Sequence, residues 1–364
     1  MAILSNILSV AVTFFAIFHA APRLSPNVPI VPPPLKSLEG QTIVVTGGTS
    51  GVGREAAIEL ASRGAEIYIT GRSKSRADKV VMHLPIFSTT TPHHGLQLDL
   101  TDPESISTFT STMKKLPKLD VLVLNAGMMY GPDFTGPFQT SNFPGGTVDT
   151  MIASNHLGSF NVLHDLLSTL ETHGTRVVFV SSISHHLGTP DLLASTADPL
   201  LATEGSSLSP SQSVGAFALY GNTKLFNVLT ANKLSRLLPS NPVTVVTPGF
   251  CATTIGSTDR SPGLFNPLEY VPLTFSAKQG GDLLVAATQI EPVFGKMLQP
   301  YWIWESVPLL KGRAKGFFFN IIQEMFFQKL VPSGMYLHSQ SEAGLDVELQ
   351  DQAWEWSKGM IGAE

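Results

Sequence analysis

The chain has 364 residues, of which 43% are hydrophobic and only 14% are charged, and its formal net charge is −5. This length is enough to bury a sizeable core in one large α/β domain or two smaller ones. The mildly acidic total comes without a basic stripe, which argues against a nucleic-acid-binding protein. The single cysteine, Cys251, excludes internal disulfides, and no Asn-x-Ser/Thr acceptor occurs, as expected of a domain that faces the cytosol.

The first 21 residues are hydrophobic and carry no charged side chain. Their apolar run, residues 7–21, is short for a bilayer span, which needs about 20 residues. A secretory signal would start with a basic region, and that region is absent. We expect residues 1–21 to be a membrane anchor, inserted as a signal anchor or a hairpin; a removed signal and a buried helix are the alternatives.

Residues 22–37 predict a linker, because six of the thirteen residues 22–34 are prolines. Such a composition favours a semi-rigid, extended chain rather than part of a core. We therefore expect the folded domain to run from residue 38 to residue 364.

Residues 41–53 read Gln-Thr-Ile-Val-Val-Thr-Gly-Gly-Thr-Ser-Gly-Val-Gly and predict a buried strand, a glycine turn and the start of a helix. We expect the helix to open at Gly53 and to end at Gly64, in the left-handed conformation that glycine adopts cheaply. The backbone at Gly47, Gly51 and Gly53 lets a pyrophosphate approach, and the helix N-terminus offers unpaired N–H groups. The stretch therefore predicts a phosphate cradle.

Short apolar runs then alternate with stretches of helical length. The runs are residues 66–70, 95–98, 121–124, 177–180 and 243–246. Alternation of this kind predicts an α/β fold with a Rossmann-type doubly wound parallel sheet, here as a single catalytic domain that follows the N-terminal hydrophobic anchor. We predict no metal site.

The second of these strands ends in Thr70-Gly71-Arg72, where a dinucleotide fold meets the adenine ribose. An acidic residue that would bind a 2′-hydroxyl is missing there. Arg72 and Arg54 are suited to grip a 2′-phosphate, so NADP(H) is favoured over NAD(H). Two solvated surface arginines are the alternative.

Tyr220 and Lys224 are four residues apart at the opening of a helical pattern, so they lie on one helix face. A nearby ammonium favours the phenolate, and we expect it to lower the pKa of Tyr220 from near 10 toward physiological pH. The pair is therefore a candidate for proton transfer to a substrate oxygen.

The spacing Thr-Gly-x-x-x-Gly-x-Gly from Thr46 to Gly53, together with Tyr220-Gly-Asn-Thr-Lys224, resembles the short-chain dehydrogenase/reductase family. The resemblance covers roughly residues 38–286. Near the C-terminus, Trp354-Glu-Trp-Ser resembles the closing helix of the retinol-dehydrogenase-like branch.

The resemblance implies catalytic roles for Tyr220, Lys224, Ser182 and Asn155. Ser182 would orient the substrate oxygen, with Ser181 as the alternative if the register shifts by one residue. Asn155 would hold a water that links Lys224 to solvent. We interpret His156 beside it as packing.

The resemblance also assigns a set of residues to the cofactor. They are Thr46, Gly47, Ser50, Gly51, Val52, Gly53, Arg54, Arg72, Asp99, Leu100, Asn125, Ala126, Gly127, Tyr220, Lys224, Pro248, Gly249 and Thr253. For Asp99, a role at a helix N-terminus is the alternative. Leu124 stands where many relatives have asparagine, and Cys251 is interpreted as a pocket-lining thiol.

Residues 291–330 predict an insertion that faces the membrane or forms a lid. Within it, residues 309–330 combine basic residues, among them Lys311, Arg313 and Lys315, with a run of aromatic and aliphatic ones. A helix of this kind could lie in a membrane interface beside the anchor, or cover an apolar substrate. Both alternatives imply a lipophilic substrate.

Together these features predict an NADP(H)-dependent oxidoreductase (EC 1.1.1.-) that interconverts a carbonyl and an alcohol, a carbonyl reductase of lipid metabolism. The expected partners are a hydrophobic small molecule of retinoid, steroid, prenyl, fatty-acyl or secondary-metabolite type and the membrane of the endoplasmic reticulum, with the catalytic domain in the cytosol. A homodimer stays open. The alternatives are a carbon–carbon double-bond reductase of the same fold and a non-catalytic NADP(H)-binding scaffold.

Overall fold

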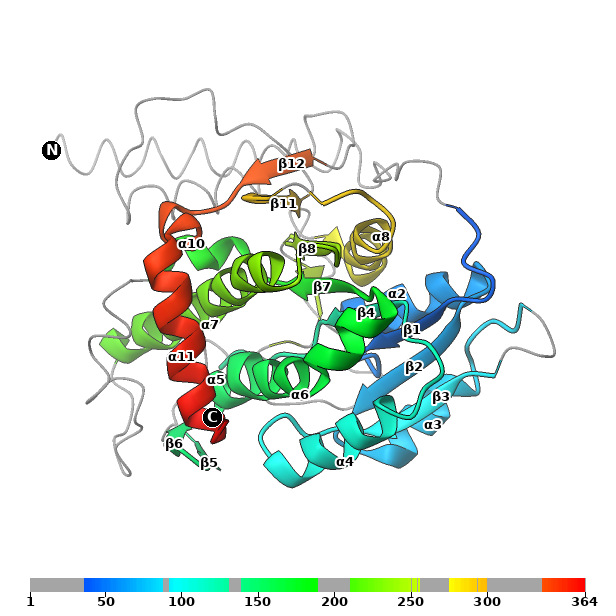
Figure 1. Ribbon diagram of the computed structural model, residues 1–364, viewed down its shortest axis with the longest axis horizontal. Helices are drawn as coiled ribbons and strands as arrows, with labels where there is room; N and C mark the ends of the chain where they lie inside the picture. The colour runs from blue at the N-terminus through cyan, green and yellow to red at the C-terminus, as the bar shows by residue number, and fades with distance from the viewer. Residues whose placement is uncertain are drawn as a thin grey trace, which may run out of the picture.

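An eight-stranded sheet forms the centre of the molecule in the computed structural model (Figure 1). The structure describes residues 36–87, 92–130, 139–188, 210–249, 251–253, 255, 275–292, 294–299 and 336–363. The sheet order is β12-β11-β8-β7-β4-β1-β2-β3, and every neighbouring pair is parallel except β11 with β12. In chain order these strands are β1 (Thr42–Val45), β2 (Glu66–Gly71), β3 (His94–Gln97), β4 (Val121–Leu124), β7 (Arg176–Val180), β8 (Val243–Val246), β11 (Lys296–Gln299) and β12 (Tyr336–Ser339).

The prediction of a Rossmann-type parallel sheet is confirmed. All six predicted strands are present, and every residue of β1 and β4 is buried, as β-branched and aliphatic runs covered on both faces require. The sequence reasoning missed β11 and β12, which extend one edge of the sheet. It also missed two small pairings, β5 (Thr140–Phe143) with β6 (Gly146–Asp149), and β9 (Cys251–Ala252) with β10 (Phe275–Ser276).

Helices cover both faces of the sheet, and each face has its own hydrophobic core. One core includes side chains of α2 (Gly51–Ser62), α3 (Lys74–Val81) and α8 (Ala277–Ala287). The other includes side chains of α4 (Pro103–Met113), α6 (Gly158–His173), α7 (Pro210–Leu237) and α11 (Val347–Ile361). Shorter elements complete the second layer: α5 (Thr150–Ile152), the π-helix η2 (Ala153–Leu157), the 3₁₀-helix η3 (Ile183–Leu187) and α10 (Glu342–Leu345).

The helix after the glycine turn begins at Gly51, two residues earlier than expected. It ends as predicted: Gly64 follows its C-cap with a φ of 99°.

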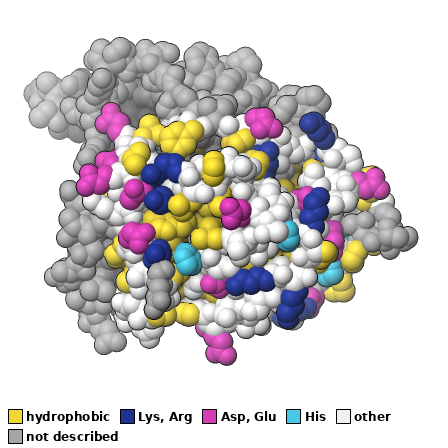
Figure 2. Space-filling model, viewed as in Figure 1, with side chains coloured by type: hydrophobic (Ala, Val, Ile, Leu, Met, Phe, Trp, Pro, Cys, Tyr) yellow, Lys and Arg dark blue, Asp and Glu magenta, His cyan; other side chains and the backbone are white. Residues whose placement is uncertain are grey.

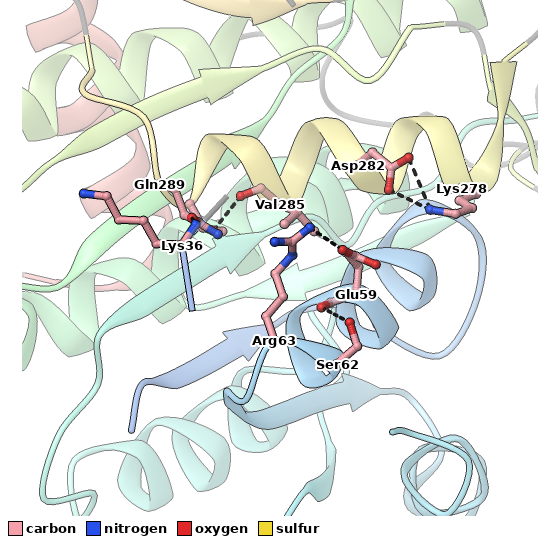
Figure 3. A network of polar contacts seen from close by, with 9 residues as sticks. Lys36, Glu59, Ser62, Arg63, Lys278, Asp282, Val285 and Gln289 are labelled. Carbon is pink, nitrogen blue, oxygen red and sulfur yellow. Dashed lines mark hydrogen bonds and ion pairs between the residues drawn. The ribbon is translucent and has the colours of Figure 1, made fainter. Parts of the chain in front are cut away.

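The first described residues are bound to residues that follow α2 and α8 (Figure 3). The backbone N–H of Lys36 donates to the side-chain oxygen of Gln289 at 2.8 Å, and the N–H of Leu38 donates to the carbonyl of Arg63 at 2.9 Å. The Arg63 guanidinium pairs in turn with Glu59. The chain therefore enters the fold at the edge where β1 begins.

In the part of the chain that the structure describes, no helix has both the length and the apolarity to cross a bilayer. The predicted anchor (residues 1–21) and the basic, aromatic stretch 309–330 lie outside the described residues, so both stay predictions. Figure 2 shows one face of the molecule, on which basic and acidic side chains are interspersed.

Candidate active site

The glycine turn joins the carboxyl end of β1 to the N-terminus of α2. Gly47 and Gly51 have φ values of 68° and 55°, which favour glycine. A Cβ on Gly53 would lie 2.4 Å from the side-chain nitrogen of Asn125, so no larger residue fits. Ser50 precedes the helix, but its side chain makes no capping hydrogen bond, which leaves the first amides of α2 available to an anion. The turn has the shape and polarity of a phosphate cradle.

The loop after β4 is fastened to this turn. The Thr46 hydroxyl accepts hydrogen bonds from the N–H groups of Asn125 (2.9 Å) and Ala126 (3.1 Å). The Asn125 amide donates to the carbonyl of Thr46 at 2.8 Å. Ala126 packs so closely on Gly47 that a Cβ there would lie 2.8 Å from the Ala126 Cα. Thr46 and Asn125 therefore shape the turn.

The two arginines expected to read the 2′-phosphate differ in their surroundings. Arg72 is exposed just beyond the end of β2. Arg54, in the first turn of α2, pairs with Glu55 at 2.9 Å, and 48% of its side chain is exposed. An exposed pair of this kind stabilises by about 1 kcal/mol or less, so it can give way to a phosphate.

Asp99 and Leu100 follow β3. Asp99 accepts hydrogen bonds from the backbone N–H (3.0 Å) and the hydroxyl (2.6 Å) of Thr101. The residue that caps α4 is Asp102 rather than Asp99. The Leu100 side chain is part of the core. The backbone oxygen of Leu100 would lie 2.0 Å from a Cβ on Gly158, so the backbone here packs directly on α6.

Tyr220 and Lys224 occupy one face of α7, with the Lys224 Nζ 5.5 Å from the centre of the Tyr220 ring. The Lys224 ammonium also donates to the carbonyl of Val180 at the end of β7, at 3.2 Å. Ser182 follows that strand and hydrogen-bonds to the phenol of Tyr220. The hydroxyl of Ser181 instead donates to the backbone carbonyl of Lys224 at 2.9 Å. Of the two adjacent serines, Ser182 is the one at the phenol.

The expected lowering of the tyrosine pKa is not found. Burial raises the pKa of Tyr220 to about 12, with the hydrogen bond between Ser182 and the phenol acting in the opposite direction and Cys251 raising it further. Burial also lowers the pKa of Lys224, to about 8. Removal of both groups from water disfavours both charged forms, and burial is the largest cause of each shift.

Asn155 lies within the π-helix η2 and is fully buried. Its side-chain oxygen accepts from the N–H of Met128 at 2.7 Å, and its nitrogen donates to the carbonyl of Met128 at 2.8 Å and to the hydroxyl of Thr223 at 3.1 Å. A Cβ on Gly127 would lie 3.2 Å from the Asn155 oxygen and 3.4 Å from the Lys224 Nζ. Asn155 therefore joins the loop after β4 to α7, beside Lys224.

The segment after β8 closes over the glycine turn. Gly249 has a φ of 82°. Thr253 lies on Gly51, where a Cβ would be 3.4 Å from its methyl group. The Cys251 thiol donates to the carbonyl of Pro248 at 3.2 Å. The remaining predicted cofactor residue, Val52, packs against the core beneath.

Several residues near the phenol were missed from the sequence. The apolar side chains of Met128, Met151 and Leu219 cluster with Tyr220 and with Tyr130. The Tyr130 hydroxyl donates to the buried carboxylate of Asp149 at 3.1 Å, and burial raises the pKa of that carboxyl to about 6. These residues come from three separate stretches, and no local pattern links them.

Comparisons with known proteins agree with this geometry. The family model described as short chain dehydrogenase matches residues 41–197. Retinol dehydrogenase 12 of Mus musculus is 31% identical over 269 residues, which cover 71% of this chain and 77% of that protein. Dehydrogenase/reductase SDR family member 13 of Bos taurus is 34% identical over 212 residues, or 58% of this chain, but this chain spans only 51% of that protein. Retinol dehydrogenase 11 of Homo sapiens is also 34% identical, over 57% of this chain and 59% of that protein.

Solved structures share the fold. An uncharacterized protein from Mycobacterium Paratuberculosis has a TM-score of 0.62 at 22% identity, with 91% of this chain and 97% of that chain covered. A short-chain dehydrogenase from Sphingobium yanoikuyae in complex with NADPH has a TM-score of 0.51 at 21% identity, with 78% and 94% covered.

A parallel Rossmann-type sheet with a glycine phosphate cradle beside a Tyr-Lys helix defines a dinucleotide-dependent class of protein. This chain belongs to the short-chain dehydrogenase/reductase family, and within it to the retinol-dehydrogenase-like members.

Proposed function

We propose that the protein is an NADP(H)-dependent oxidoreductase that interconverts a carbonyl and an alcohol on a lipophilic small molecule. The observation that carries the proposal is the meeting of Ser182, Tyr220 and Lys224 next to the glycine turn. A proton donor, a hydroxyl beside it and an ammonium are the groups that carbonyl reduction requires.

The residues of the turn fit a dinucleotide. Gly47 and Gly53 let the loop after β4 pack directly on the turn, because a Cβ at either position would clash with Ala126 or Asn125. The first amides of α2 face an anion without a side-chain cap. The absence of an acidic residue at the end of β2 and the exposure of Arg72 support NADP(H) over NAD(H). When bound, the nicotinamide would supply a hydride to the carbonyl carbon.

The protein's own residues would handle the proton. Ser182 donates a hydrogen bond to the substrate oxygen and fixes its place beside Tyr220. The Tyr220 phenol, held protonated by its raised pKa, transfers its proton to that oxygen as the negative charge develops. Lys224 binds the ribose and returns a proton to Tyr220. Asn155 holds together the loop and the helix that enclose this proton path.

Apolar surroundings support a lipophilic substrate. Met128, Tyr130, Met151 and Leu219 surround the phenol without presenting a charge to it. β11 ends and β12 begins at the carboxyl edge of the sheet, which is also the edge of the phenol, whereas the first described residues lie at the opposite edge. This favours a lid within residues 291–330 over a membrane-bound helix beside the anchor. An anchor in residues 1–21 and an endoplasmic-reticulum location with a cytosolic domain complete the proposal.

The test is NADPH oxidation by the full chain in detergent micelles, with retinal, a ketosteroid, a prenal and an aromatic ketone as substrates. Tyr220→Phe is the matched control, and NADH is the competing cofactor. We expect turnover that prefers NADPH, yields the alcohol and falls at least about 100-fold in the variant.

Other outcomes would redirect the proposal. A saturated carbonyl product would identify a double-bond reductase. NADPH binding without turnover on any substrate would support the scaffold alternative, and absence of NADPH binding would contradict the proposed cofactor site.

A further inference from the structure

The last described residues, 336–363, contact every element that carries a candidate catalytic residue. We call them the C-terminal segment; it comprises β12, α10 and α11. In Figure 1 α11 (red) lies across α7 and α6. The segment lies beyond residues 41–197, the part of the chain that the family model matches.

A first contact reaches the π-helix η2. His156 directly follows Asn155, and its Nε2 is 2.7 Å from the hydroxyl oxygen of Ser357 in α11. The Ser357 hydroxyl donates its one proton to the carbonyl of Ala353 at 2.7 Å, so His156 must be the donor to Ser357. The imidazole is fully buried and stacks on Phe226 at 4.3 Å. His156 is therefore a neutral ring with its proton on Nε2.

A second contact reaches the turn that begins at Ser182. The Nδ1 of His185 is 2.8 Å from the carbonyl oxygen of Ser182, which can only accept, so Nδ1 carries the proton. Its Nε2 then accepts the backbone N–H of Ser341, the N-cap of α10, at 3.2 Å. The two histidines are thus held in opposite tautomers. The hydroxyl of Ser357 fixes the proton of His156 on Nε2, and the carbonyl of Ser182 fixes that of His185 on Nδ1.

Both stretches depart from regular α-helix: η2 is a π-bulge in the continuous helix that runs from α5 into α6, and η3 is a short, separate turn. η2 has five residues with π-type hydrogen bonds, and η3 has five residues of 3₁₀-helix, whose geometry is poorer than that of an α-helix. Asn155 must meet both backbone groups of Met128, and Ser182 must meet the phenol of Tyr220. At such irregular positions, a hydrogen bond from another element can help to fix the orientation of the neighbouring side chain.

We propose that the C-terminal segment is a positioning element of the active site. Through Ser357 and Ser341 it holds His156 and His185, and these histidines fix the turns that place Asn155 and Ser182. The inference rests on the proposed function, because it assigns the segment a part in that same site.

A third contact provides a matched control. Asp351 of α11 forms ion pairs with Lys233 (2.8 Å) and Arg236 (2.5 Å) of α7. These pairs fasten the segment to the far end of α7 and touch neither turn. Asp351→Asn should therefore loosen the segment without releasing His156 or His185.

The experiment compares Ser357→Ala, His185→Asn and Asp351→Asn in the full chain. His185→Asn keeps a donor near the Ser182 carbonyl but cannot reach Ser341. We expect Ser357→Ala and His185→Asn to lower kcat about tenfold or more while the KM for NADPH changes less than about twofold. Asp351→Asn should lower thermal stability by a similar amount but leave kcat unchanged.

A rescue separates the hydrogen bond of His156 from its packing. His156→Phe keeps an aromatic ring against Phe226 without a donor, whereas His156→Gln keeps a donor without the ring. Recovery of kcat in the glutamine variant, but not in the phenylalanine variant, is the expected result. The reverse order would overturn the proposal.

Hydrogen exchange read by mass spectrometry gives a second readout that needs no turnover. Peptides that cover residues 150–158 should exchange faster in Ser357→Ala, and those that cover 181–188 faster in His185→Asn, but neither in Asp351→Asn. Unchanged exchange in these peptides, or a kcat that simply follows thermal stability in all three variants, would refute the positioning role. If these peptides exchange faster in the two variants but the wild type itself shows no turnover, the proposed function alone would be contradicted.

Discussion

Replacement of Lys224 by methionine should make the cofactor-free protein more stable while it abolishes turnover. The side chain is 3% exposed, and burial lowers its pKa from 10.5 to about 8. One pKa unit corresponds to about 1.4 kcal/mol, so the buried ammonium costs about 3 kcal/mol at pH 7, where both the folded and the unfolded chain carry the charge. The cost shrinks as the pH rises from 8 to 10.5 and is absent above, where both states are neutral.

Some of this gain is lost with the hydrogen bond of the lysine. The carbonyl of Val180 would lose Lys224 as a donor but keep the side-chain amide of Asn227, at 3.3 Å. A typical hydrogen bond contributes about 1 kcal/mol. We therefore expect a net gain of about 2 kcal/mol at pH 7, or several degrees in Tm.

The assay is urea unfolding of the cofactor-free full chain in detergent at pH 7 and pH 9.5. Lys79→Met, at an exposed position, is the control and should change little. The gain of Lys224→Met should fall by more than half at the higher pH. A variant that is less stable than the wild type at pH 7, or a gain that is the same at both pH values, would refute the reasoning.

Four further substitutions test other parts of the structure. Gly158→Ala places a methyl group 2.0 Å from the backbone oxygen of Leu100 and should cost at least about 2 kcal/mol of unfolding free energy, whereas Gly359→Ala, with open space around it, should be neutral or stabilising. Gly53→Ala places a methyl group 2.4 Å from an amide nitrogen and should weaken NADPH binding about tenfold or more in a fluorescence titration; unchanged binding would contradict the cradle. Because burial raises the folded-state pKa of Asp149 from 3.8 to about 6, the wild type should gain up to about 3 kcal/mol relative to Asp149→Asn as the pH falls from 7 to below 4 in unfolding experiments, and a pH-independent difference would rule this out.

Local patterns were sufficient for the central sheet and the glycine turn. Runs such as residues 43–45 and 121–124 are apolar along their whole length, and only burial on both faces accounts for that. β11 and β12 were missed because Lys296–Gln299 and Tyr336–Ser339 mix polar and apolar residues and lack the continuous apolar run of a strand that is buried on both faces.

The candidate site was predictable where one stretch carries the chemistry, as with Tyr220 and Lys224 on one helix face. It was not predictable where partners come from distant parts of the chain. His156 and Ser357 are 201 residues apart, and nothing in either local sequence indicates the other. The pKa of Tyr220 was predicted in the wrong direction, because the sequence revealed a nearby cation but not how deeply both groups are buried.

That raised pKa bears on the direction of the proposed reaction. With a pKa of about 12, only about one phenol in 10⁵ is ionised at pH 7, so Tyr220 holds a proton ready for a substrate oxygen. Oxidation of an alcohol needs the phenolate instead, and the one cation beside the ring in the described residues, Lys224, has a pKa of only about 8. Negative charge on a bound dinucleotide would raise the pKa of Lys224 and stabilise its ammonium form. Cofactor binding would thus strengthen the group that eases proton loss from Tyr220, whereas in the cofactor-free site the phenol keeps its proton.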